Sequence, residues 1–157
     1  MKGLKMKLGF KKVHTDAKLP SYAHVGDAGM DVCSVEDVIL FPFTPTLVKT
    51  GLVVEIPTGY ELQVRPRSGL ALKKGITVWN SPGTIDSGYK GEIGIILLWA
   101  PMTQLATPDV KQDFEWIKKG DRIAQLVLAP VTKADIVEVS EVSETERGTG
   151  GFGSTGF

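Results

Sequence analysis

The stretch TLVKTGLVVEIPTGYELQVRP, Thr46 to Pro66, indicates the kind of fold that this chain adopts. Its first part, TLVKTGLVVEIP, is β-branched and apolar, and its last part, YELQVRP, alternates strictly between apolar and polar residues. Because successive side chains of a strand point to opposite faces, this alternation predicts a strand with one buried and one exposed face. The apolar face holds Tyr60, Leu62 and Val64, and the polar face holds Glu61, Gln63 and Arg65.

Similar short runs, separated by Pro and Gly, follow along the chain: DVILF, GITVW, EIGIILLW, RIAQLVLAPV and DIVEVSEV. Many short strands with turn signals between them indicate an all-β sandwich, barrel or jelly roll. One helix is predicted for SGLALKKG, with Ser68 as a suitable cap and Gly75 as a stop. We expect a β core over residues 1–142, followed by a detachable C-terminal arm over residues 143–157.

Composition limits the class of protein. The chain has 157 residues, of which 42% are hydrophobic and 23% charged, as expected for one compact domain. Its net charge of zero lacks the basic excess of a generic nucleic-acid binder, and no apolar run is long enough to span a bilayer. The start, MKGLKMKLGFKK, lacks the apolar centre of a signal peptide, and the single Cys33 excludes an internal disulfide. We therefore expect a protein of the cytoplasm, or of the host-cell interior if viral, that binds neither nucleic acid nor membrane.

The segment RPRSGLALKKG, Arg65 to Gly75, is a candidate phosphate site. If a helix begins at Ser68, the free N–H groups of its first turn carry partial positive charge. Arg67 adds a permanent cation beside them. An ordinary helix start with a surface arginine explains the same residues.

The segment NSPGTIDSGYKGE, Asn80 to Glu92, is predicted to form a β-hairpin, because Pro82-Gly83 and Ser87-Gly88 are turn pairs. The backbone of such a hairpin and the Asn80 amide offer donors and acceptors to the edge of a planar base. Partial burial beside Ile85 would keep Asp86 poised as a base, and Tyr89 could pack flat against a sugar. A hairpin whose Asp and Tyr only stabilise turns is the alternative.

The segment GDAGMDV, Gly26 to Val32, places the carboxylates of Asp27 and Asp31 four residues apart. Two carboxylates near phosphates suggest a magnesium site that acts through water, since magnesium keeps much of its hydration. A pair of Asx-turns is the alternative.

The segment GDRIAQLV, Gly120 to Val127, runs from a turn into an apolar strand. Gln125 is its polar exception, and it either faces solvent or reaches into a site.

The tail RGTGGFGSTGF, Arg147 to Phe157, combines glycines with groups suited to a nucleotide. Glycines let successive N–H groups approach an anion, and Arg147, Ser154 and Thr155 add a charge and two hydroxyls. Phe152 could stack on a base. A disordered tail is the alternative on composition alone.

These five segments, in this order from Asp27 to Gly156, resemble the five motifs of the trimeric deoxyuridine triphosphatases (dUTPases). The resemblance implies a jelly-roll fold and a homotrimer with active sites between subunits. It also implies that water attacks the α-phosphorus of dUTP with the help of Mg²⁺ and yields dUMP and pyrophosphate. That reaction limits uracil in DNA and supplies dUMP for dTMP synthesis.

The resemblance also assigns residue roles. Asp86 would deprotonate the water, and Asp31 would hold a water of the Mg²⁺ ion. The phosphates would be bound by Arg67, Ser68, Gly69, Gln125, Arg147, Gly153, Ser154 and Thr155. The nucleoside would be bound by Asn80, Gly83, Thr84, Ile85, Asp86, Tyr89 and Phe152. In the family, the arm usually closes over a neighbouring subunit's site.

Two other functions remain open. A dCTP deaminase shares this fold family, although its chemistry needs an acid/base placed near the pyrimidine C4. Alternatively, a dUTPase could bind a protein partner through an inserted loop at residues 103–116, within the unusually long stretch from Trp99 to Lys119.

Overall fold

The computed structural model describes residues 6–101 and 113–151 of the chain. Over these residues the protein consists of short β-strands and one short helix, so the predicted all-β class is confirmed. The elements are β1 (Gly9–Lys12), β2 (Met30–Cys33), β3 (Val38–Leu40), β4 (Thr46–Lys49), β5 (Leu52–Glu55), β6 (Tyr60–Arg65), α1 (Ser68–Lys74), β7 (Ile76–Val78), β8 (Gly83–Asp86), β9 (Gly94–Trp99), β10 (Glu115–Ile117) and β11 (Arg122–Pro130).

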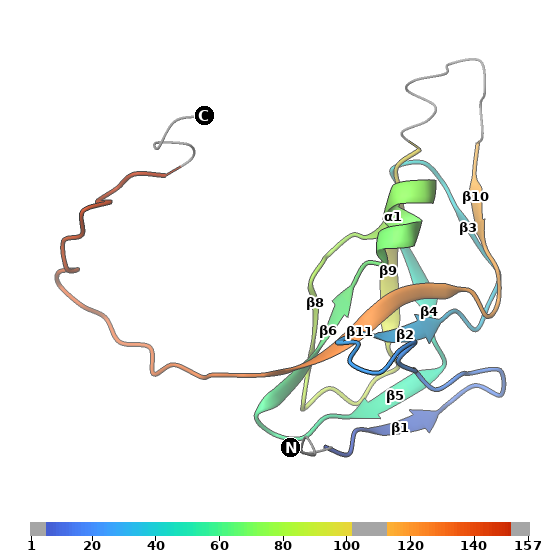
Figure 1. The fold of residues 1–157 in the computed structure, drawn as a ribbon, viewed down its shortest axis with the longest axis horizontal. Helices are drawn as coiled ribbons and strands as arrows, with labels where there is room; N and C mark the ends of the chain where they lie inside the picture. The colour runs from blue at the N-terminus through green and yellow to red at the C-terminus, as the bar shows by residue number, and fades with distance from the viewer. Residues whose placement is uncertain (1–5, 102–112, 152–157) are drawn as a thin grey trace.

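The largest sheet has the strand order β2-β11-β6-β8, and all its pairs are antiparallel (Figure 1). Its inner face is apolar, as the alternation of YELQVRP predicted: Leu62 and Leu126 are fully buried. Its outer face is mostly polar. Because directly opposite residues of an antiparallel pair share a face, Gln125 lies between Asp31 and Arg65 in one row across this face.

A second sheet, β4-β9-β7, and two ribbons, β1-β5 and β3-β10, complete the body. All three contribute to one hydrophobic core, and together with the largest sheet they form a jelly roll. Burying a Leu, Ile or Val side chain contributes about 1.5–3 kcal/mol each. The largest fully buried side chains are Leu40, Leu52, Leu62, Ile76, Ile93, Ile95, Leu97, Ile123 and Leu126.

The apolar run TLVKTGLVVEIP contains two strands that belong to different sheets. Gly51 separates β4 from β5 with a positive φ of 68°, a conformation that favours glycine. A Cβ atom at Gly51 would also come within 2.7 Å of the His14 Cβ and 2.9 Å of the Ala17 Cβ. The turn therefore sends β4 to pair with β9 and β5 to pair with β1.

The predicted helix is confirmed over Ser68–Lys74, but its N-cap is Arg67 and not Ser68. No side chain caps the start, because Ser68 already has helical geometry and exposes its hydroxyl. The end is as predicted: Gly75 is left-handed, with φ 67°, and its N–H donates to the carbonyl of Ala71. In the described part of the chain, no helix is long and apolar enough to cross a membrane.

The C-terminal segment leaves the body after β11. Residues 131–151 run outward without forming a strand, and Figure 1 shows them as a long extension on one side of the molecule. The strand predicted for DIVEVSEV is therefore wrong for the single chain, where Ile136 and Val142 are 97% and 84% exposed. Its alternation is real, but a strand forms only where a neighbouring strand pairs with its backbone groups.

The proposed insertion at residues 103–116 is described only in part, since residues 102–112 lie outside the described ranges. Its end belongs to the body: β10 pairs with β3, so that Trp116 lies opposite Ile39. The Phe114 and Trp116 rings meet edge to face at 6.2 Å, and the Lys118 Nζ lies 3.7 Å from the centre of the Trp116 ring.

Candidate active site

An arginine cluster, made of Asp31, Arg67 and Arg122, lies on the outer face of the largest sheet. The Arg67 Nε donates to the Asp31 Oδ1 at 2.9 Å, and the Arg122 Nη1 donates to the Asp31 Oδ2 at 3.0 Å. The Arg67 Nη1 also donates to the carbonyl of Arg122 at 3.2 Å. Asp31 is only 8% exposed, so the two charge-assisted bonds compensate for the burial of its carboxylate.

Two predicted site residues border this cluster. Gln125 lies opposite Asp31 in the pairing of β11 with β2, and its side chain packs against Gly29. A Cβ atom at Gly29 would come within 3.1 Å of the Gln125 Cβ, so glycine at position 29 leaves room for the Gln125 side chain. Ser68, at the start of α1, follows Arg67 directly and is exposed.

Asp27 and Asp31 have different environments. The Asp27 Oδ2 accepts a hydrogen bond from the His24 N–H at 2.8 Å, so Asp27 is held within its own loop. This bond is not an Asx-turn, in which the donor stands two residues after the aspartate. Asp31 instead faces the two arginines. Among the described residues, no group of three or more His, Cys, Asp or Glu side chains could hold a metal ion.

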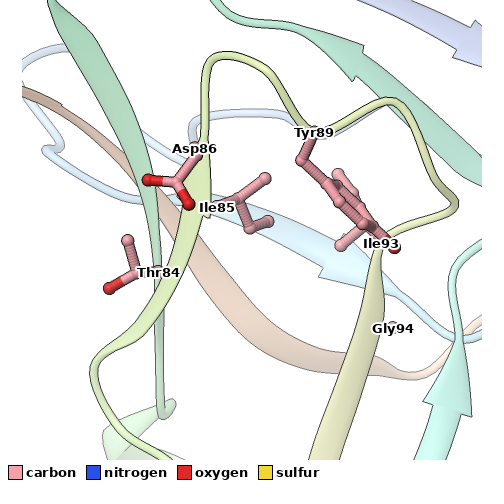
Figure 2. Close-up of a pocket in the computed structure, with 6 residues that line it drawn as sticks. All are labelled: Thr84, Ile85, Asp86, Tyr89, Ile93 and Gly94. Atoms are coloured by element: carbon pink, nitrogen blue, oxygen red, sulfur yellow. The ribbon is translucent and has the colours of Figure 1, made fainter.

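A second candidate region, the Asp86 pocket, lies between β8 and the start of β9. It has a volume of about 180 Å³ and is lined by Thr84, Ile85, Asp86, Tyr89, Ile93 and Gly94. Figure 2 shows Thr84 and Asp86 on one side of β8 and Ile85 on the other side, directed toward Tyr89. Sequence reasoning found the first four of these residues and missed the wall formed by Ile93 and Gly94.

The Tyr89 ring is fixed by its own loop. Its hydroxyl donates to the carbonyl of Glu92 at 3.0 Å. A Cβ atom at Gly91 would come within 2.6 Å of the Tyr89 Cζ, so only glycine leaves room for the ring at this position. The ring therefore forms a preset side of the pocket.

Gly94 is covered from the neighbouring strand. A Cβ atom at Gly94 would come within 2.6 Å of the Leu47 Cδ1, where Leu47 projects from β4. The wall of the Asp86 pocket at Gly94 is therefore backbone, with the Leu47 side chain packed over it.

Two predictions about this region are wrong. The segment Asn80–Glu92 does not form a β-hairpin on its own strands: β8 pairs with β6, whereas β9 pairs with β4 and β7. Asp86 is exposed in the single chain and not partly buried, because β8 is an edge strand and Asp86 points outward. Asn80 lies beside the first residue of β8, since its amide nitrogen would be 3.3 Å from a Cβ atom at Gly83, but neither residue lines the Asp86 pocket.

The arginine cluster and the Asp86 pocket are separate within one chain. In the register of the sheet, Gln125 lies opposite Arg65 and Asp86 lies opposite Glu61. Arg65 and Glu61 stand four residues apart on β6, about 13 Å at the usual rise of a strand. The candidate site residues therefore form two separate groups within one chain.

The C-terminal residues lie apart from both groups. The Arg147 Nε donates to the carbonyl of Gly150 at 2.8 Å, within a local turn of the outward-running segment. Phe152, Gly153, Ser154 and Thr155, which we expected to contact a ligand, are outside the described residues.

Sequence reasoning missed one cluster residue, Arg122. Its signal was present in GDRIAQLV, where a charged residue stands directly before an apolar run. On β2, Cys33 lies opposite Arg122, and burial raises the pKa of its thiol, so Cys33 stays a neutral, half-buried side chain.

Comparison with known proteins identifies the family. The family model described as dUTPase matches residues 15–156. A deoxyuridine 5'-triphosphate nucleotidohydrolase of Hydrogenobaculum sp. is 53% identical over 97% of this chain and 99% of its own length. The chain belongs to the dUTPase family and is a hydrolase of nucleotide metabolism.

Solved structures agree with this assignment. A variant of the Staphylococcus bacteriophage 80alpha dUTPase, solved with dUpNHpp, has a TM-score of 0.84 and 31% identity, with 98% of this chain and 100% of that chain covered. A variant of the dUTPase from phage phi11 of S. aureus, whose structure concerns the coordination of a structural Mg(II) ion, has a TM-score of 0.76 and 30% identity. That match covers 87% of this chain and 98% of that chain.

Proposed function

We propose that this dUTPase hydrolyses dUTP to dUMP and pyrophosphate with Asp86 as the general base. A water oxygen bonds to the α-phosphorus while the bond from that phosphorus to the bridging oxygen breaks. Pyrophosphate leaves, and the proton of the water passes to the Asp86 carboxylate. The observation that carries this assignment is an exposed carboxylate, Asp86, on a strand that lines a pocket together with Tyr89, whose ring is fixed by its hydroxyl.

The Asp86 pocket accounts for the choice of deoxyuridine. The backbone from Gly83 to Asp86 and the Asn80 amide pair with the edge of uracil, and cytosine would present its amino group to a donor. Thymine differs from uracil only by a methyl group, so close contact with the backbone of this segment has to exclude it. The Tyr89 ring packs under the deoxyribose and leaves no space for a ribose hydroxyl.

The arginine cluster binds the triphosphate. Arg67, the start of α1 at Ser68 and Gly69, and Gln125 surround one patch of the outer sheet face. Phosphoryl transfer needs mainly positioning and neutralisation of charge, and guanidinium groups provide both.

Each complete site is made by more than one copy of the chain in a homotrimer. This assembly is supported by the separation of Asp86 from the arginine cluster and by the outward course of residues 131–151 (Figure 1). The arm from residue 143 onward brings Arg147 and Phe152 to the site of a neighbouring subunit, where the arm closes over the nucleotide.

Magnesium is the expected cofactor, and the residues present fit it as a phosphate-bound, hydrated ion. Each carboxylate oxygen of Asp31 accepts one bond from an arginine and keeps a lone pair for a water of the ion. When bound, magnesium neutralises charge on the triphosphate. Asp31 would hold a water of the ion, while Arg67 would contact the phosphates directly.

The test is release of pyrophosphate from dUTP, dTTP, dCTP and UTP in parallel, with and without Mg²⁺. We expect release from dUTP alone, with a strong dependence on Mg²⁺. Equal release from dTTP or UTP would contradict the role of the pocket. Ammonia released from dCTP would instead identify a deaminase.

A further inference from the structure

Strand β11 contains a β-bulge beside the arginine cluster. Arg122 lies opposite Cys33 and Ala124 lies opposite Val32, so Ile123 is an extra residue in the pairing with β2. Residues three apart in a regular strand point to opposite faces, but the bulge brings Arg122 and Gln125 to the same outer face. The burial of the side chains agrees with this bulge, since Ile123 and Ala124 are consecutive residues and both are buried. The bulge therefore aims Arg122 at Asp31.

Arg122 contacts both other members of the cluster. Its side chain donates to the Asp31 Oδ2 at 3.0 Å, and its backbone carbonyl accepts from the Arg67 Nη1 at 3.2 Å. Asp31 in turn accepts from the Arg67 Nε at 2.9 Å. The three residues thus form a closed ring of hydrogen bonds, which fixes the plane of the Arg67 guanidinium.

Exposure separates the roles of these residues. The Asp31 side chain is 9% exposed, whereas the Arg122 side chain is 56% exposed. An exposed ion pair contributes little by itself, but a buried carboxylate that loses a partner is strongly affected. Removing Arg122 would leave one Asp31 oxygen without its partner and free the carboxylate to turn toward Arg67.

We propose that Arg122 is a positioning residue that holds the Asp31 carboxylate and thereby keeps Arg67 aimed at the triphosphate. Arg122 acts through Asp31 and does not contact the phosphates. With Asp31 held from both sides, the remaining N–H groups of Arg67 stay available to the ligand. This inference rests on the proposed function of the arginine cluster.

A double-mutant cycle on the full chain tests the proposal. The affinity for dUpNHpp with Mg²⁺ is measured by calorimetry for the wild type, Arg122→Ala, Asp31→Asn and the double variant. We expect Arg122→Ala to weaken binding about tenfold in the wild type and less than about twofold beside Asp31→Asn, because residues that act as one unit are not additive. Equal weakening in both backgrounds overturns the proposal, since it means that Arg122 contacts the ligand directly.

Two further variants separate positioning from loss of charge or fold. Arg122→Lys should recover part of the affinity, because an ammonium can still reach the Asp31 carboxylate. Lys119→Ala removes a cation three residues before Arg122, where the Lys119 Nζ pairs with the Asp16 Oδ2 at 2.9 Å, and it should leave binding unchanged. A loss with Lys119→Ala equal to that with Arg122→Ala would show a general effect of charge and overturn the proposal.

Folding and activity are followed on the same preparations. If Arg122→Ala does not fold by circular dichroism, the cycle is repeated with Arg122→Gln and judged by the same criterion. Wild-type pyrophosphate release from dUTP tests the proposed function separately. Its absence refutes that function, whereas an additive cycle in an active enzyme refutes only the role of Arg122.

Discussion

The arginine cluster and Asp86 lie on one sheet face, but the carboxylates of Asp31 and Asp86 are held differently. Asp31 is 8% exposed and accepts a hydrogen bond from each of two arginines. Asp86 is exposed, and no side-chain hydrogen bond joins it to any other residue in the described ranges. The comparison suggests that a carboxylate that organises binding is fixed in advance, whereas one that accepts a proton keeps its lone pairs free.

The largest effect on turnover should come from replacing Asp86, the exposed carboxylate. Asp86→Asn should lower turnover of dUTP about 10³-fold, because the amide cannot accept the proton, while affinity for dUpNHpp stays near that of the wild type. Stopped-flow pyrophosphate release and calorimetry measure the two quantities.

Glu61→Gln is the matched control, since Glu61 lies opposite Asp86 on the same sheet face. It should retain most of the turnover. Near-normal turnover of Asp86→Asn, or equal losses in the two variants, would remove Asp86 from its assigned role.

A smaller loss should follow when the arm is shortened. A chain that ends after Glu146 should keep its melting temperature and its trimer, because the last strand ends at Pro130. Its catalytic efficiency should fall about 10²-fold through loss of positioning. Light scattering and steady-state kinetics check both statements, and monomers after truncation would show that the arm holds the assembly together.

The tyrosine of the Asp86 pocket should affect selectivity more than rate. Tyr89→Ala should lower the preference for dUTP over UTP about tenfold, since the ring no longer excludes a ribose hydroxyl. Competition between the two nucleotides measures this ratio. Tyr22→Ala, at a tyrosine that is 53% exposed elsewhere, is the control and should leave the ratio unchanged.

The smallest effect should come from breaking an ion pair at the surface, where the carboxylate is exposed and not buried as Asp31 is. The hydrogen bond and the charge of Lys119 hold the pKa of Asp16 below its ordinary value of 3.8. The pair therefore stabilises the fold above pH 3.8, and this contribution is lost as the pH falls through the lowered pKa. Lys119→Ala should shift the melting temperature only slightly at pH 7, and less in high salt. A difference in melting temperature between the wild type and Lys119→Ala that persists below the lowered pKa of Asp16 would contradict this assignment.

The sequence predicted the elements whose signals are local. The alternation of YELQVRP placed β6 and both its faces correctly, and Gly75 marked the end of α1. The start of α1 at Ser68 was predicted correctly, but its cap was not, because Arg67 takes the cap position without a side-chain bond. A local pattern cannot distinguish these two caps.

Features that depend on a distant partner were not predictable. The split at Gly51 follows from packing against His14 and Ala17, and β8 pairs with β6 instead of with the strand that follows it. The role of Arg122 depends on a bulge, which is visible only once β11 is paired with β2. DIVEVSEV has the pattern of a strand, but the single chain offers it no partner.

The contact between Leu47 and Gly94 links two positions that are far apart in the sequence. The Leu47 methyl group occupies the space beside Gly94, so a side chain at position 94 would require Leu47, which is 60% exposed, to turn toward solvent or to be replaced by a smaller residue. Among homologues, a side chain at position 94 should therefore occur together with a smaller residue at position 47. Laboratory evolution of this pocket should accordingly recover changes at the two positions as a pair, even though position 47 lies on another strand.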